Sequence, residues 1–120
     1  MITERTSVGL DVHARSTVAA AIDEQTGELV HRRVGSTTDE IVAWVTGLPG
    51  PVAATYEAGP TGFGLARSLT AAGVRCMVAA PSKLQRPVGD RVKTDTRDAV
   101  HLARLLRLGG IVEGTPPSGA

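Results

Sequence analysis

The chain has 120 residues, 42% of them apolar, and a formal net charge of +1. This length fits a single domain with a buried core. Trp44, Tyr56 and Phe63 are its only aromatic residues, which argues against a surface that binds single strands by stacking bases. The sequence shows neither a charged-then-apolar leader nor an apolar run near 18 residues, so we expect a cytoplasmic protein with no membrane partner.

Three strands joined by tight turns are predicted in the first part of the chain. Residues 7–12 and 17–23 alternate between apolar and other side chains, and residues 29–34 form a third strand after a Gln-Thr-Gly-Glu turn. Asp11 lies near the end of the first strand. Short connections of this kind predict an antiparallel meander.

A helix is predicted next, opened by Thr37 and Glu40. These residues fit the capping box, in which each side chain meets the backbone amide of the other residue. The Pro-Gly-Pro sequence at 49–51 ends this helix, and a short buried strand over 52–56 leads to Glu57. A glycine-rich turn, a helix to about Ala72 and a strand over 74–79 follow.

The last part of the chain is predicted to hold a polar, basic loop over 81–93 and a strong helix over 94–108. We assign residues 1–114 to one domain and 115–120 to a flexible tail. The order β-β-β-α-β-α-β-α predicts an α/β fold with a mixed sheet, because the later strands alternate with helices and add in parallel. This order is typical of the ribonuclease H-like fold.

Positive charge is concentrated near the last helix. Residues 83–107 contain seven basic and three acidic residues, a local charge of +4. Acids embedded in a basic segment suit a phosphate-binding surface with a metal site inside it. The alternative is an ordinary solvated helix face with ion pairs four residues apart. The charged residues are Lys83, Arg86, Asp90, Arg91, Lys93, Asp95, Arg97, Asp98, Arg104 and Arg107.

Four acids are candidates for a metal site. Asp11 is on a strand among apolar residues, Glu57 comes just after another strand, and Asp95 and Asp98 share one face of the last helix. Carboxylates that converge at one sheet edge repel each other unless cations neutralise them. Mg²⁺ prefers such hard oxygen ligands, and two ions about 4 Å apart stabilise the attacking and leaving oxygens in phosphodiester chemistry.

Each acid also has a simpler interpretation. Asp95 and Asp98 could merely favour a helix amino terminus, and Glu57 could be an ordinary loop acid. Asp11 is the hardest to dismiss, because a carboxylate at the end of an apolar strand is costly unless it is paired. His13 could reach the same edge or lie exposed in a turn. Cys76 is the single cysteine, which predicts a buried, inert thiol.

Three motifs resemble those of the DEDD transposases of bacterial insertion sequences, a group that includes the Piv-type invertase and is RuvC-like. The motifs are Val-Gly-Leu-Asp-Val-His at 8–13, Tyr-Glu-Ala-Gly-Pro-Thr-Gly at 56–62 and Lys-Thr-Asp-Thr-Arg-Asp-Ala at 93–99. They occur in the family's order. The similarity extends over residues 7–112.

The resemblance implies a fold like that of Holliday-junction resolvases and DNA cleavage and rejoining in transposition. It implies that Asp11, Glu57, Asp95 and Asp98 bind Mg²⁺, with Mn²⁺ as a substitute. It also implies DNA as a partner, a structured guide RNA in some members, and homo-oligomers. The basic side chains that it places against nucleic acid are Lys83, Arg86, Arg91, Lys93 and Arg97.

Family members continue into a helical spacer and a second domain with a serine proposed as the nucleophile, and this sequence contains neither. We therefore keep two alternatives to a catalytic domain. One is a non-catalytic module for nucleic-acid binding or dimerisation. The other is a fragment of an actin-like or sugar-kinase ATPase, whose phosphate loop would need smaller residues than His13, Ala14 and Arg15.

Overall fold

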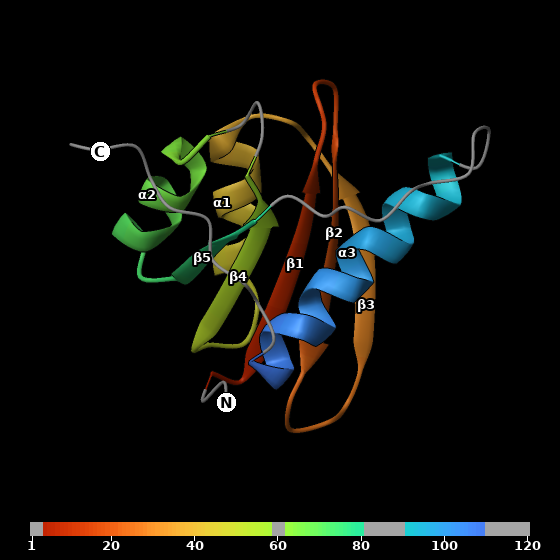
Figure 1. Cartoon of the computed structure of the whole chain (residues 1–120). Helices are drawn as coiled ribbons and strands as arrows, with labels where there is room; N and C mark the ends of the chain where they lie inside the picture. Colours follow the sequence, from red (N-terminus) through yellow and green to blue (C-terminus); the bar gives the residue numbers. More distant parts are fainter. Residues whose placement is uncertain (1–3, 59–61, 81–90, 110–120) are drawn as a thin grey trace.

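The computed structural model describes residues 4–58, 62–80 and 91–109, and only the backbone over 91–97. Five strands and three helices follow one another in this part of the chain (Figure 1). Their bounds are β1 Thr6–Val12, β2 Thr17–Asp23, β3 Leu29–Val34, α1 Thr38–Thr46, β4 Val52–Glu57, α2 Gly64–Ala71, β5 Arg75–Ala79 and α3 Arg91–Leu108.

The strands form one mixed sheet in the order β3-β2-β1-β4-β5, with β1 at its centre. β1 pairs with β2, and β2 with β3, in antiparallel fashion. β1 pairs with β4, and β4 with β5, in parallel. The predicted α/β fold with a meander followed by parallel additions is thereby confirmed, and the arrangement is consistent with a ribonuclease H-like fold.

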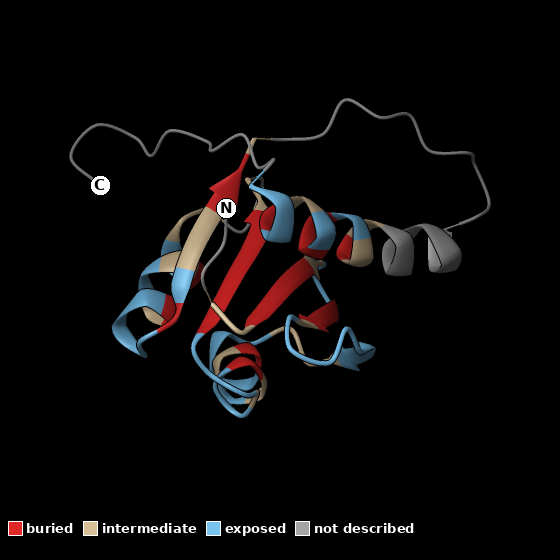
Figure 2. Cartoon of the chain, turned by 90° about the horizontal axis from the view of Figure 1, so that it is seen from below, coloured by how far each residue is buried: buried red, intermediate tan, exposed pale blue. Residues whose placement is uncertain are grey.

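The sheet lies between two layers of helix. Helices α1 and α2 cover one face and α3 crosses the other, as the two views in Figures 1 and 2 show. The face under α1 and α2 holds large apolar side chains, because alternate residues of β1 and β4 point toward these helices. Its largest fully buried members are Leu10, Ile41, Val45, Tyr56 and Leu69.

The opposite face is built from small side chains. Val18, Ala20 and Ile22 of β2 pack against Ala99 and Ala103 of α3. Between them lies Gly9 of β1. A Cβ atom at this position would overlap the Ala99 carbonyl oxygen and lie 2.6 Å from the Ala103 amide nitrogen. The absence of a side chain at Gly9 therefore lets the backbone of α3 approach the central strand closely.

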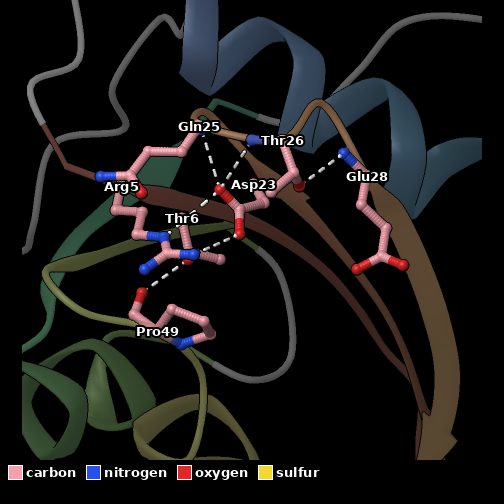
Figure 3. A network of polar contacts seen from close by, with 7 residues as sticks. All are labelled: Arg5, Thr6, Asp23, Gln25, Thr26, Glu28 and Pro49. Atoms are coloured by element: carbon pink, nitrogen blue, oxygen red, sulfur yellow. Dashed lines mark hydrogen bonds and ion pairs between the residues drawn. The ribbon is translucent and has the colours of Figure 1, made fainter.

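A polar network fixes the amino-terminal edge of β1 (Figure 3). The Arg5 guanidinium donates to both carboxylate oxygens of Asp23, at 3.3 and 3.0 Å, and the amides of Gln25 and Thr26 also donate to Asp23. The Arg5 hydrogen bond is the main reason that the pKa of Asp23 lies below its usual value. The Thr6 hydroxyl donates to the Pro49 carbonyl at 2.6 Å.

The structure corrects two local predictions. Helix α3 begins at Arg91, so residues 91–93 are helical rather than part of the loop, and Asp95 and Asp98 lie beyond the first turn. At α1, the Thr37 hydroxyl accepts from the Glu40 amide at 3.2 Å as expected. The Glu40 carboxylate, however, accepts from that hydroxyl at 2.8 Å rather than from the Thr37 amide.

Three further predictions fall outside the described residues. They are the greater part of the loop, over 81–90, the domain boundary at residue 114 and the tail over 115–120. These stay predictions from the sequence.

Candidate functional site

Asp11 and Glu57 lie at the carboxyl ends of neighbouring parallel strands. The register pairs Leu10 of β1 with Tyr56 of β4, so the next residue on each strand is an acid. Asp11 is opposite Val18, which faces α3. Thr55 pairs with Gly9, which lies against α3. Glu57 follows Thr55 by two residues and so points to the same side of the sheet. Both acids therefore belong to the α3 face, one interstrand spacing of about 4.8 Å apart.

Helix α3 crosses the sheet obliquely, with its carboxyl-terminal end toward the amino end of β1. Its middle crosses Gly9, and Arg107 near its end forms an ion pair with Glu24 at the opposite edge of the sheet. In Figure 1 the amino-terminal half of α3 extends over β2 and β3, on the side of the sheet away from β4.

Asp98 lies on the flank of α3 that faces away from β2. Val100, two residues later and thus on the other flank of the helix, packs against the β2 cluster. Asp98 is half-buried and its Oδ2 atom is buried. Asp95 precedes it by three residues, a spacing that places both positions on one face of the helix. Since neither is in the first turn, where helix-dipole stabilisation is strongest, the helix-terminus interpretation loses support.

His13 interacts directly with Asp11. Its Nε2 atom lies 3.0 Å from Asp11 Oδ2, and the two side chains are 39% and 13% exposed. The turn that carries His13 is closed by a 3.0 Å hydrogen bond from the His13 amide to the Ser16 carbonyl. The histidine is therefore both turn-exposed and within reach of the candidate site, so the two sequence interpretations describe one arrangement.

Tyr56 anchors the chain that follows Glu57. Its ring is buried, and its hydroxyl donates to the Gly62 carbonyl at 2.7 Å and accepts from the Ala66 amide at 3.1 Å. Burial raises the pKa of this hydroxyl, which therefore stays protonated as a donor. This role was not predicted from the sequence. An aromatic residue with a polar end in a strand of small residues was the available signal.

The carboxylates of the four candidate acids are suitable ligands for a hard cation, since Mg²⁺ and Mn²⁺ prefer carboxylate oxygens. Within residues 4–58, 62–80 and 91–109, no three His, Cys, Asp or Glu side chains form a group that could hold a metal ion. The Asp95 side chain is not among those described. The four-acid metal site thus stays a prediction, for which the structure supplies the positions of the acids.

The predicted nucleic-acid contacts are only partly located. Arg91, Lys93 and Arg97 belong to the first two turns of α3, where the backbone alone is described. Lys83 and Arg86 lie outside the described residues.

Cys76, by contrast, is located and is a free thiol in β5. Burial raises its pKa to about 12, so at neutral pH it carries no reactive thiolate, as predicted.

The comparisons with known proteins agree with the three motifs. The model of the transposase family DEDD_Tnp_IS110 matches residues 8–118. The chain belongs to this transposase family. Over 104 residues, 83% of the chain, it is 36% identical to the transposase for insertion sequence element IS1533 of Leptospira borgpetersenii. Over 54 residues, 45% of the chain, it is 61% identical to y4qE of Sinorhizobium fredii, also named as a transposase.

The chain spans 30% of the length of the Leptospira transposase and 14% of that of y4qE. It is a domain of the transposase family, and this membership favours the transposase hypothesis over an actin-like ATPase fragment. In the described part of the chain, no helix is both long and apolar enough to cross a membrane.

Proposed function

We propose that this transposase domain cleaves DNA and takes part in strand transfer, using one or two Mg²⁺ ions held by Asp11, Glu57, Asp95 and Asp98. Mn²⁺ would substitute. The observation that carries the proposal is the position of Asp11 and Glu57 at adjacent strand ends, on the face of the sheet that α3 covers. When bound, the metal would activate the nucleophile and neutralise the scissile phosphate.

The protein's part in this chemistry is to hold carboxylates rigidly at one point. Asp11 is on the central strand, which is paired on both sides. His13 Nε2 contacts one Asp11 oxygen, which orients the carboxylate, and the Tyr56 hydroxyl fixes the turn after Glu57. Carboxylates held in this way need little reorganisation when a cation and a phosphate arrive, which favours catalysis.

The partners are part of the same proposal. Basic residues around the start of α3 would bind the phosphates of DNA, and in some complexes those of a guide RNA. The chain covers at most 30% of the length of the relatives compared. We therefore assign only phosphodiester cleavage to this domain. Rejoining and homo-oligomer formation are assigned to the complete transposase, with its second domain. The residues proposed for the nucleic-acid contact are Lys83, Arg86, Arg91, Lys93 and Arg97.

Titration with paramagnetic Mn²⁺, followed by NMR, tests the metal site. We expect the amide signals nearest Asp11, Glu57 and Asp98 to broaden first, and Mg²⁺ to reverse the effect. Asp11→Asn should weaken the broadening at least tenfold, because the central ligand is lost. Glu28→Gln is the matched control, since Glu28 is an exposed acid at the opposite edge of the sheet. Equal broadening in wild type and Asp11→Asn would contradict the site.

A non-catalytic DNA-binding module is the second candidate. The chain spans 30% of the length of the Leptospira transposase, and this partial coverage favours it. Asp11→Asn in a complete transposase distinguishes the two, because a catalytic domain would lose DNA excision and keep DNA binding. Excision at the wild-type rate would establish the binding module instead.

A further inference from the structure

Arg33 lies in line with Asp11 across the sheet. Asp11 pairs with Val18, and Val18 pairs with Arg33 of the edge strand β3. Residues directly opposite one another point to the same face, so Arg33 belongs to the face that carries the acids. Two interstrand spacings separate the Cα atoms of Asp11 and Arg33, roughly 10 Å. Arg32, the preceding residue, pairs with Ala19 and faces the α1 and α2 side.

The Arg33 guanidinium is held against the exposed turn between β1 and β2. Its Nη1 atom donates to the Ser16 hydroxyl at 2.9 Å. The Ser16 carbonyl accepts from the His13 amide, and the His13 ring contacts Asp11. Arg15 is exposed in the same turn. The loop that follows the strand of Asp11 therefore carries Arg15 and accepts a hydrogen bond from Arg33.

The ion pairing of the arginines differs between the two ends of strand β1. At the amino end of β1, Arg5, Arg75 and Arg107 each form an ion pair, with the acids Asp23, Glu4 and Glu24. In the described part of the chain, neither Arg15 nor Arg33 forms one. A guanidinium has five N–H donors and suits phosphate, so these two groups are available for an external anion.

We propose that Arg15 and Arg33 form a second contact with the DNA backbone, the edge contact, beside the acids. The inference rests on the proposed function only in taking DNA as the substrate. DNA rises about 3.4 Å per nucleotide along each strand, so a phosphate at Arg33 would be about three nucleotides from the one at Asp11. Self-pairing of β3 between two copies is disfavoured, because Arg32 and Arg33 would bring like charges together.

Salt-dependent DNA binding, measured by fluorescence anisotropy in EDTA, tests the edge contact without involving any metal. We expect Arg33→Gln to weaken binding of a 20-base-pair duplex roughly tenfold at low salt. The slope of log K against log salt should fall by about 0.9, because one phosphate contact is lost. Arg32→Gln is the matched control on the opposite face and should keep the wild-type affinity and slope.

Arg33→Lys is the control for an effect on folding. It keeps the positive charge and should therefore keep the salt slope. Binding in EDTA involves no metal, so failure of the metal site leaves this test intact. The edge contact is overturned if Arg33→Gln matches wild type, if Arg32→Gln loses as much, or if Arg33→Lys also loses the slope. A loss confined to RNA of the same sequence would equally overturn it.

Discussion

The two faces of the sheet differ in the size of the side chains that they bury. The face under α1 and α2 is filled by large apolar side chains such as Leu10, Ile41 and Leu69, which are almost fully buried. At the crossing of α3, the opposite face is lined by small residues such as Gly9, Ala20 and Ala99, and the hydroxyls of Ser7 and Thr55 are buried. Burial of large side chains supplies most of the free energy of folding, so the first face holds the domain together.

On the α3 face, small side chains bury less apolar surface and let the helix come closer to the sheet. With Gly9 and Ala99 at the crossing, the helix backbone reaches the central strand directly. Acids on a helix this close to the sheet can approach acids at the strand ends. We therefore expect substitutions of the aliphatic residues on the α1 and α2 face to alter stability alone, and those on the α3 face to alter the site as well.

Leu69→Ala should have the largest effect on stability. Leu69 is 0% exposed, and truncating such a residue lowers the free energy of unfolding by about 2–5 kcal/mol through lost burial and the cavity left behind. Urea denaturation measures the change. Leu108→Ala, at a position that is 77% exposed, should change stability by less than about 0.5 kcal/mol. A comparable loss in both variants would contradict the division between the faces.

Gly9→Ala should cost less stability and damage the site more. The new Cβ would overlap the Ala99 carbonyl, and overpacking of this kind lowers the free energy of unfolding by about 1–3 kcal/mol. Displacing α3 would also move Asp98, so Mn²⁺ broadening near Asp11 should weaken in the folded variant. Gly64→Ala, where a Cβ meets nothing within 4 Å, is the control. Full metal binding by Gly9→Ala would refute the proposed role of proximity.

Thr55→Val should have the smallest effect, with the opposite sign. The Thr55 hydroxyl is buried with no hydrogen-bond partner in the described part of the chain, so replacing it with a methyl group should raise stability by about 1 kcal/mol. Thr6→Val is the matched control, because the Thr6 hydroxyl donates to Pro49 and its loss should lower stability by a similar amount. Thermal melting of both variants measures the difference, and a destabilised Thr55→Val would show that its hydroxyl has a partner.

Local signals predicted most of the fold. β2 and β3 have the bounds expected from their sequences, because alternation and turn residues act over a few positions. Helix α3 begins three residues earlier than predicted, because the basic residues 91–93 were assigned to the preceding loop. The Glu40 carboxylate took an alternative partner within the same cap, a choice that sequence spacing does not determine.

The site was predictable only in its residue types and strand positions. Placing Asp11 and Glu57 at strand ends required nothing beyond alternation and turns. The close approach at Gly9, the hydroxyl bridge of Tyr56 and the alignment of Arg33 with Asp11 all depend on partners distant in the sequence. Such pairings follow from tertiary packing, which local propensity does not specify.

The contact between β1 and α3 joins the first element described to the last one. During translation Asp11 and Glu57 leave the ribosome well before Asp95 and Asp98, and domains complete their folding only as such late elements arrive. A nascent or prematurely terminated copy would therefore carry only half of the proposed ligand set.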